Sequence, residues 1–73
     1  MINPAQCRAA RGLLRWTQED LASNSGISIV TIRNFEAEKT ANPQNSTLKL
    51  LYLAFENAGV ELIDDGRPGV RMM

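Results

Sequence analysis

The fold can be predicted from residues 17–37, which read TQEDLASNSGISIVTIRNFEA. Thr17 and Asp20 have the spacing of a capping box, in which each side chain accepts a hydrogen bond from the other residue's backbone amide. Gly26 favours the left-handed conformation that ends helices, and Ser28 favours a new helix start. The stretch therefore predicts two short helices joined by a tight turn.

These two helices, 18–25 and 29–37, are too short to be stable alone, so their value lies in the angle between them. A tight turn that contains glycine holds two helices roughly perpendicular, and the second can then enter the major groove of DNA while the first crosses the phosphates. Their apolar positions fit a shared core: Leu21, Ala22, Ile27, Ile32 and Phe35. Residues 17–37 therefore predict a helix-turn-helix with its recognition helix at 29–37.

A helix is also predicted before the motif. Asn3 is a favourable cap, Pro4 is a favourable first residue, and good helix formers continue to Arg15. Gly12 interrupts them, at a cost of about 1 kcal/mol relative to alanine. We expect the backbone either to pack closely against a neighbour at Gly12 or to loosen there, near the end of the helix.

A further helix is predicted after a surface loop that begins at Glu38. Ser46 or Thr47 is expected to cap this helix, and Gly59 is expected to end it. Apolar residues recur every three to four positions, which is the spacing of a core-facing stripe: Leu48, Leu51, Phe55 and Ala58.

Leu50 and Leu53 lie off this stripe and make the helix apolar over more of its circumference than a monomer requires. They lie either at an interface with a second chain or against the first helix or the tail. The tail, residues 60–73, has β-branched residues around a Gly- and Pro-containing turn, which predicts a short β-hairpin or strand. Such strands must pack on the helices or pair with a second chain. The candidate dimer residues are Leu50, Leu53, Val60, Leu62 and Val70.

Composition argues against catalysis. The 73 residues include no histidine, so the usual general base and any Cys/His metal cluster are absent, and we expect neither an enzyme nor a cofactor. Asp64 and Asp65 are adjacent in a Gly/Pro-rich stretch and are interpreted as a solvated turn rather than an acid/base pair. Cys7 is the single cysteine and is interpreted as a small buried hydrophobe rather than a reactive thiol.

No apolar run approaches the about 20 residues that span a bilayer, and the N-terminus lacks a signal sequence, so we expect a soluble, cytoplasmic protein. The net charge of zero argues against nucleic-acid binding. The charges are unevenly distributed, however, because residues 1–49 carry six Lys/Arg and four Asp/Glu, whereas residues 50–73 carry two and four. The part of the chain that contains the motif, residues 1–49, is therefore the basic one.

The residues of the motif carry a specific resemblance. The segments that match are Thr17 to Ala22, Gly26 to Ser28, Thr31 with Ile32, and Phe35 with Glu36. With them the chain resembles the Xre family of lambda repressor and Cro-like helix-turn-helix regulators over roughly residues 8–60. The resemblance implies an all-α, lambda repressor-like DNA-binding domain of four to five short helices at 1–59. The β extension at 60–73 follows this domain and is a candidate dimerisation element.

The same resemblance implies a function. It predicts a transcriptional regulator, a repressor, that binds a two-fold symmetric DNA operator as a homodimer, because one short recognition helix reads too few base pairs alone. The alternative is an antitoxin-like or accessory module of the same fold that binds a protein partner, with DNA binding secondary. In that case the apolar residues of the last helix and the tail would carry the function.

Roles follow residue by residue from the resemblance. Gln18 would bind a phosphate and brace the recognition helix, and Lys39 lies where the family often touches the DNA backbone. Arg11 and Glu36 would form a structural ion pair beneath the surface. The exposed recognition positions would be Ser28, Ile29, Val30, Thr31, Arg33 and Asn34.

The recognition positions differ from a glutamine-rich reading face. Ile29 and Val30 are apolar and can contact thymine methyl groups but cannot make bidentate hydrogen bonds. Asn34 would select adenine, Arg33 would contact guanine or a phosphate, and Thr31 would contact a phosphate or cap the helix. Arg8 and Arg15 are interpreted as solvent-facing charges, with a phosphate contact as the alternative.

Overall fold

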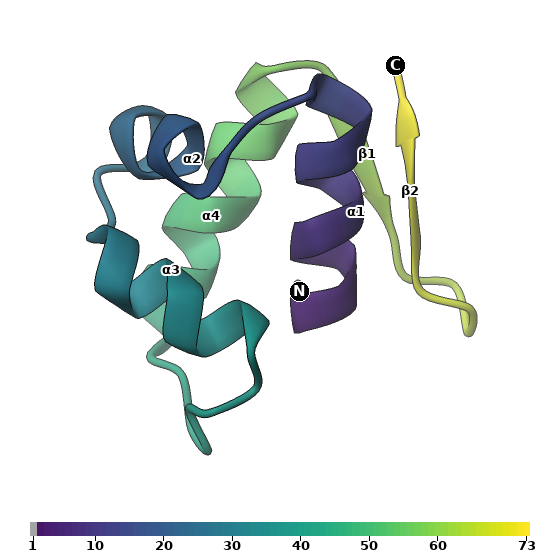
Figure 1. The fold of residues 1–73 in the computed structure, drawn as a ribbon. Coiled ribbons are helices and arrows are strands. Elements are labelled where there is room, and N and C mark those ends of the chain that lie inside the picture. The colour runs from purple at the N-terminus through teal and green to yellow at the C-terminus, as the bar shows by residue number, and fades with distance from the viewer. Residues whose placement is uncertain (1) are drawn as a thin grey trace.

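The computed structural model describes residues 2–73, which form four helices and a C-terminal hairpin (Figure 1). In chain order, the elements are α1 (Pro4–Leu14), α2 (Gln18–Ser25), α3 (Ile29–Glu36), α4 (Asn45–Asn57), β1 (Val60–Ile63) and β2 (Gly69–Met72). The predicted fold class is therefore confirmed, with four helices rather than five. Residue 1 of the predicted domain 1–59 lies outside the described residues. Within residues 2–73, no helix has the length and hydropathy that crossing a membrane requires.

Local capping explains where the first three helices begin. Asn3 caps α1 by accepting from the amide of Gln6, and Thr17 forms the predicted capping box with Asp20. Gly26 ends α2 with a φ of 76°, and Ser28 accepts from the amide of Thr31 at the start of α3. The turn between α2 and α3 is thus fixed from both sides.

The prediction for the start of α4 was wrong. The helix is preceded by Gln44, which makes no side-chain capping hydrogen bond, and Ser46 and Thr47 lie inside its first turn. Because no side chain caps this end of α4, capping preferences could not predict where the helix begins.

Gly12 lies two residues before the end of α1. Apart from its chain neighbours and the backbone of its own helix, no described atom comes within 4 Å of the position where a Cβ would stand. Close packing therefore does not explain this glycine. The other explanation remains, which is that the helix tolerates a glycine near its end.

The core lies between the helices and the hairpin. Its fully buried side chains include Cys7, Leu21, Ile32, Leu51, Phe55 and Val60. Trp16, which precedes the cap of α2, stacks on Phe55 of α4 with ring centroids 5.9 Å apart. The core thus joins the helix-turn-helix to α4.

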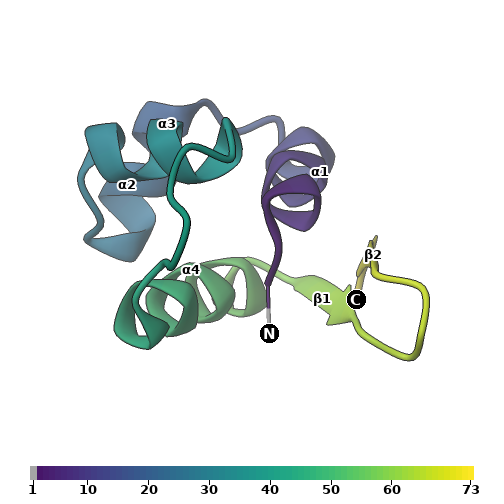
Figure 2. The ribbon, with the colours of Figure 1, turned by 90° about the horizontal axis from the view of Figure 1, so that it is seen from below.

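The hairpin is antiparallel, with Val60 opposite Met72 and Ile63 opposite Gly69, and it packs on α1 and α4 (Figures 1 and 2). Of the two predicted ways to stabilise it, packing on the helices is therefore realised. Val60 is completely buried in this packing, so its assignment to a dimer surface was wrong. Because β1 follows α4 directly, its first side chain points into the monomer's own core.

The other dimer candidates differ from one another. Leu62 and Val70 are half-buried and pack against the core. Leu50 and Leu53 remain exposed, at 43% and 37%, so neither α1 nor the tail buries them.

Gln6 attaches the hairpin to α1. This buried side chain accepts from the amide of Asn3 through Oε1, and through Nε2 it donates to the carbonyls of Ile63 at 2.9 Å and Gly69 at 3.1 Å. The two carbonyls stand opposite each other at the turn end of the hairpin. One side chain therefore completes the helix cap and holds both strands.

We expect Gln6→Glu to destabilise the hairpin by about 2 kcal/mol, because the carboxylate still accepts from Asn3 but has no donor for the two carbonyls. Hydrogen exchange of the Ile63 and Gly69 amides measures this opening, and urea unfolding gives the free energy. Exchange at the wild-type rate would contradict the role of Gln6.

Candidate nucleic-acid interface

The recognition helix α3 is held by one face and exposed on the other. Ile32 and Phe35 are buried in the core, and Glu36 is buried beside them at 5% exposure. Figures 1 and 2 show α2 and α3 on one side of α1 and the hairpin on the other. The exposed face of α3 is therefore free of the tail.

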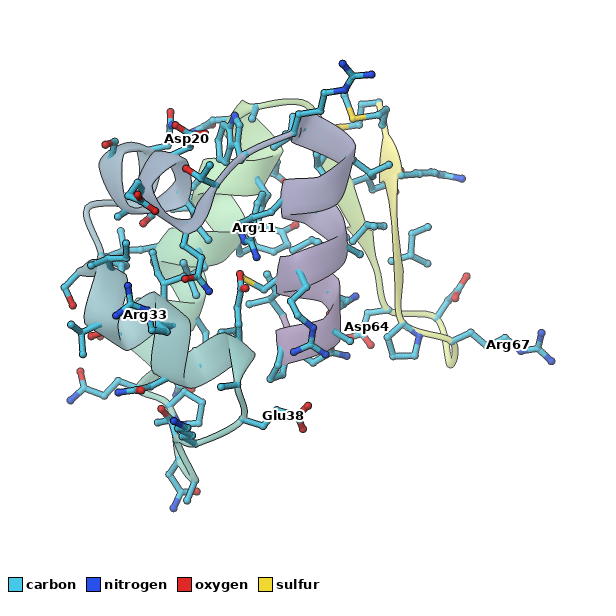
Figure 3. The ribbon with its side chains drawn as sticks, viewed as in Figure 1. Arg11, Asp20, Arg33, Glu38, Asp64 and Arg67 are labelled. Carbon is cyan, nitrogen blue, oxygen red and sulfur yellow. The ribbon has the colours of Figure 1, made fainter. Side chains whose placement is uncertain are left out.

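The structure brings most of the predicted recognition residues to this exposed face. Val30 is 57% exposed, and Asn34 and Ile29 are half-buried. Arg33 is exposed on α3 (Figure 3). Val30 and Arg33 are three residues apart and Asn34 follows at four, so they share one surface of the helix. An apolar contact and two polar groups are thus presented together.

The start of α3 is ordered by two hydroxyl groups. Ser28 Oγ accepts from the amide of Thr31 at 3.2 Å and donates to Thr31 Oγ1 at 2.9 Å. The Thr31 hydroxyl is an acceptor in this pair, so its own hydrogen can be donated outward. Thr31 therefore takes part in the cap and still has a donor to offer a ligand.

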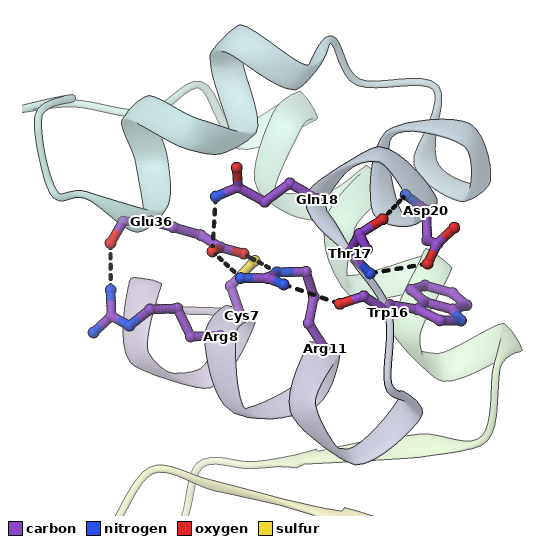
Figure 4. Close-up of polar contacts among 8 residues, drawn as sticks. All are labelled: Cys7, Arg8, Arg11, Trp16, Thr17, Gln18, Asp20 and Glu36. Atoms are coloured by element: carbon purple, nitrogen blue, oxygen red, sulfur yellow. Dashed lines mark hydrogen bonds and ion pairs between the residues drawn. The ribbon is translucent and has the colours of Figure 1, made fainter.

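Beneath the helix, the Glu36 carboxylate is the centre of a buried network (Figure 4). Arg11 binds it with two hydrogen bonds of 2.7 Å, from Nε to Oε2 and from Nη2 to Oε1. Gln18 Nε2 donates to Oε1 at 3.2 Å, and Cys7 Sγ donates to Oε2 at 3.2 Å. One carboxylate of α3 is thereby bound to both α1 and α2, and the implied Arg11–Glu36 pair is present.

A family model described as helix-turn-helix matches residues 8–56. This span covers more than half of the chain and contains the whole network around Glu36 except Cys7. The chain belongs to the Xre and lambda repressor-like helix-turn-helix family. It is therefore a DNA-binding helix-turn-helix regulator. No curated protein matches the chain. The hairpin lies outside the matched span.

Electrostatics keep the network of this Xre-family regulator charged. Burial raises the pKa of the Glu36 carboxyl, but the hydrogen bonds from Arg11, Cys7 and Gln18 outweigh burial and hold that pKa below its usual value. The hydrogen bond to Glu36 likewise raises the pKa of Arg11. Burial, and then the hydrogen bond to Glu36, raises the pKa of the Cys7 thiol. Cys7 is therefore a protonated thiol that donates a hydrogen bond. A buried thiol with a raised pKa is unreactive, in agreement with the interpretation of Cys7 as a buried residue rather than a reactive thiol.

Arg8 has a role in the regulator that was not predicted from its sequence. Its Nη1 donates to the backbone carbonyl of Glu36 near the end of α3, and its Nη2 lies 3.9 Å from Glu38. Arg8 is therefore tied to the carbonyl end of the recognition helix, where a cation is favourable, rather than being only a solvated charge. The i,i+3 spacing of Arg8 and Arg11 on α1 was the available signal.

The remaining predicted contacts flank the exposed face. Lys39 is exposed just after α3, and its amide donates to the carbonyl of Asn34 at 2.9 Å. Gln18 lies at the start of α2 with one of its two N–H groups directed to Glu36. Its second N–H group is thus available to an acceptor outside the protein.

Proposed function

We propose that this regulator is a repressor that binds a two-fold DNA operator as a homodimer, with α3 in the major groove. The observation that carries the proposal is the division of α3 into two faces. Ile32, Phe35 and Glu36 anchor one face, and the exposed face presents Val30 and Arg33. A groove of about 12 Å admits a helix of this kind, and rigid support keeps its reading side chains in register.

The proposed base contacts follow from chemistry. Ile29 and Val30 contact thymine methyl groups, Asn34 pairs with adenine, and Arg33 contacts guanine or a phosphate. The proposed backbone contacts come from Gln18, Ser28, Thr31 and Lys39. These groups are neutral apart from Lys39, and hydroxyl and amide donors position a protein on DNA without adding charge. Such contacts reconcile DNA binding with a net charge of zero.

The proposed two-fold symmetry follows from the length of α3. An eight-residue helix contacts only a few base pairs, so two copies are needed for a specific site. Half-sites are then expected about 34 Å apart, one turn of DNA.

Selection of bound sequences from a random DNA pool tests the proposal. We expect a two-fold consensus with half-sites one helical turn apart, and binding of this consensus at least about 1,000-fold tighter than of unrelated DNA. Enrichment of a single asymmetric half-site would contradict the homodimer. A pool without any enriched motif would contradict sequence-specific repression.

The exposed leucines of α4 favour a second candidate, a protein-interaction module with secondary DNA binding. Leu50 and Leu53 offer an apolar surface that a monomeric regulator does not need. Under this candidate, Leu53→Asp abolishes activity, whereas replacement of Arg33 and Asn34 leaves it intact.

A further inference from the structure

The outer side of α4 carries an apolar stripe that the described chain leaves uncovered. Leu50 is 43% exposed and Leu53 is 37% exposed. Ser46 and Asn57 continue the stripe by one turn in each direction, with spacings of four, three and four residues. The buried residues of the same helix, Leu51, Ala54 and Phe55, lie on a different side. The leucines are therefore central in a stripe with polar ends.

The two charges of α4 flank this stripe. Lys49 and Glu56 are exposed and are seven residues apart, which is two turns, so they lie on the same flank. A rise of about 10.5 Å separates them along the helix, which is too far for an ion pair with each other. Glu56 accepts from the Tyr52 hydroxyl at 2.9 Å, and no ion pair of Lys49 is found among residues 2–73. Opposite charges thus stand at opposite ends of one flank.

We propose that a second copy of the chain packs antiparallel on this stripe, with Leu50 of each copy against Leu53 of the other. The inference rests on the proposed homodimer and names its surface. In an antiparallel pair related by a two-fold axis, equivalent flanks face each other with their ends reversed. Lys49 then meets Glu56 of the partner subunit, and the same pair recurs across the axis.

A parallel arrangement lacks this complementarity. In a parallel pair, the flank with Lys49 and Glu56 faces the other flank of the partner helix. That other flank has no charged residue, because Lys49 and Glu56 are the only charged residues of α4. The antiparallel stripe also shares no residue with the exposed face of α3. Pairing through α4 therefore uses none of the proposed reading side chains.

The leucine contact is tested with Leu53→Asp, and Leu13→Asp is its matched control. Leu13 is an equally exposed leucine, at 44%, but lies on α1. We expect Leu53→Asp to weaken the dimer at least about tenfold, because a carboxylate in an apolar interface loses its hydration. Sedimentation equilibrium gives the dimer dissociation constant, and thermal unfolding verifies that both variants fold. A wild-type chain that stays monomeric at millimolar concentration, or equal dimerisation of the two variants, would overturn the inference.

A charge exchange tests the antiparallel direction. We expect Lys49→Glu and Glu56→Lys each to weaken the dimer about three- to tenfold at low salt, since each places like charges together twice per dimer. The double variant restores both pairs and should return to within about twofold of wild type. Tyr52→Phe controls for the hydrogen bond that Glu56→Lys removes. Additive weakening in the double variant would exclude this arrangement.

DNA binding separates this inference from the proposed function. If α4 forms the dimer, Leu53→Asp still binds a single half-site like wild type but loses the cooperative gain on a two-fold site. If the dimer forms elsewhere, the cooperative gain survives this substitution, and the inference fails while the proposed function stands. If wild type selects no DNA motif but Leu53→Asp breaks its dimer, the proposed function fails and the inference stands.

Discussion

Replacing Arg33 and Asn34 together with alanine is expected to abolish sequence-specific DNA binding by this regulator. Each well-placed base contact discriminates by about 1–3 kcal/mol, so the loss of two contacts corresponds to about 2–6 kcal/mol, or at least about 30-fold in affinity for the selected site. The Arg33 side chain is exposed, and the fold does not depend on it. Fluorescence anisotropy with the selected DNA and with scrambled DNA measures the effect.

Arg67→Ala is the matched control for this variant. Arg67 is an exposed arginine in the hairpin turn, and Figure 3 shows it on the side of the molecule opposite Arg33. Both replacements remove one positive charge, so a general electrostatic effect would weaken binding equally. We expect Arg67→Ala to change the affinity less than about twofold, in line with the loss of one remote charge. Equal losses in the two proteins would contradict base reading by α3.

The second large effect is expected for Glu36→Gln, which should destabilise the fold by about 3–5 kcal/mol. The replacement leaves the Arg11 guanidinium, whose side chain is only 20% exposed, without its counter-charge. The free energy of unfolding of a small domain is only about 5–15 kcal/mol in total. A loss of this size is a large part of it, so we expect the variant to be partly unfolded at about 37 °C. Urea unfolding followed by circular dichroism measures the change.

Glu38→Gln is the matched control for Glu36→Gln, because it also removes a glutamate that faces an arginine, but one exposed to solvent. Glu38 lies 3.9 Å from Arg8, and its side chain is 68% exposed, so its loss should cost less than about 1 kcal/mol. A change as large as that in Glu36→Gln would show that burial of the network is not the cause.

The same carboxylate makes stability depend on pH. Because the pKa of Glu36 is lower in the folded than in the unfolded chain, its contribution is complete above the unfolded-state pKa and disappears as the pH falls through the folded-state pKa. The wild-type free energy of unfolding should therefore decrease in acid. The corresponding slope should be shallower in Glu36→Gln, and parallel curves would contradict this assignment.

Much of the fold was predictable because its signals are local. Thr17, Gly26 and Ser28 act within four residues of themselves, through caps and a left-handed turn, and the structure has each of these features. The start of α4 was not predictable in this way, since Gln44 precedes the helix without a side-chain cap. The hairpin could be predicted from its β-branched residues and its turn, but the sequence left open whether it packs on the helices or pairs with a second chain.

The contacts that hold the candidate interface were less accessible from sequence. Arg11 and Glu36 were paired only through the family resemblance, because they are 25 residues apart. The Cys7 and Arg8 contacts to Glu36 depend on the crossing of α1 and α3, which no local pattern encodes. Val60 was wrongly assigned to a dimer surface because an apolar strand residue can face either the core of its own chain or a partner, and the sequence does not distinguish the two. Burial in three dimensions decides between these cases.

The attachment of the hairpin to Gln6 also affects the order in which the protein can fold during translation. Gln6 leaves the ribosome before its two carbonyl partners, which are 57 and 63 residues further along the chain. Helix–turn–helix contacts between neighbours in sequence can form while synthesis continues, whereas closure of α1 against the hairpin must wait until Gly69 has emerged. Until then, the side of α1 that receives the hairpin is open to chaperones and proteases.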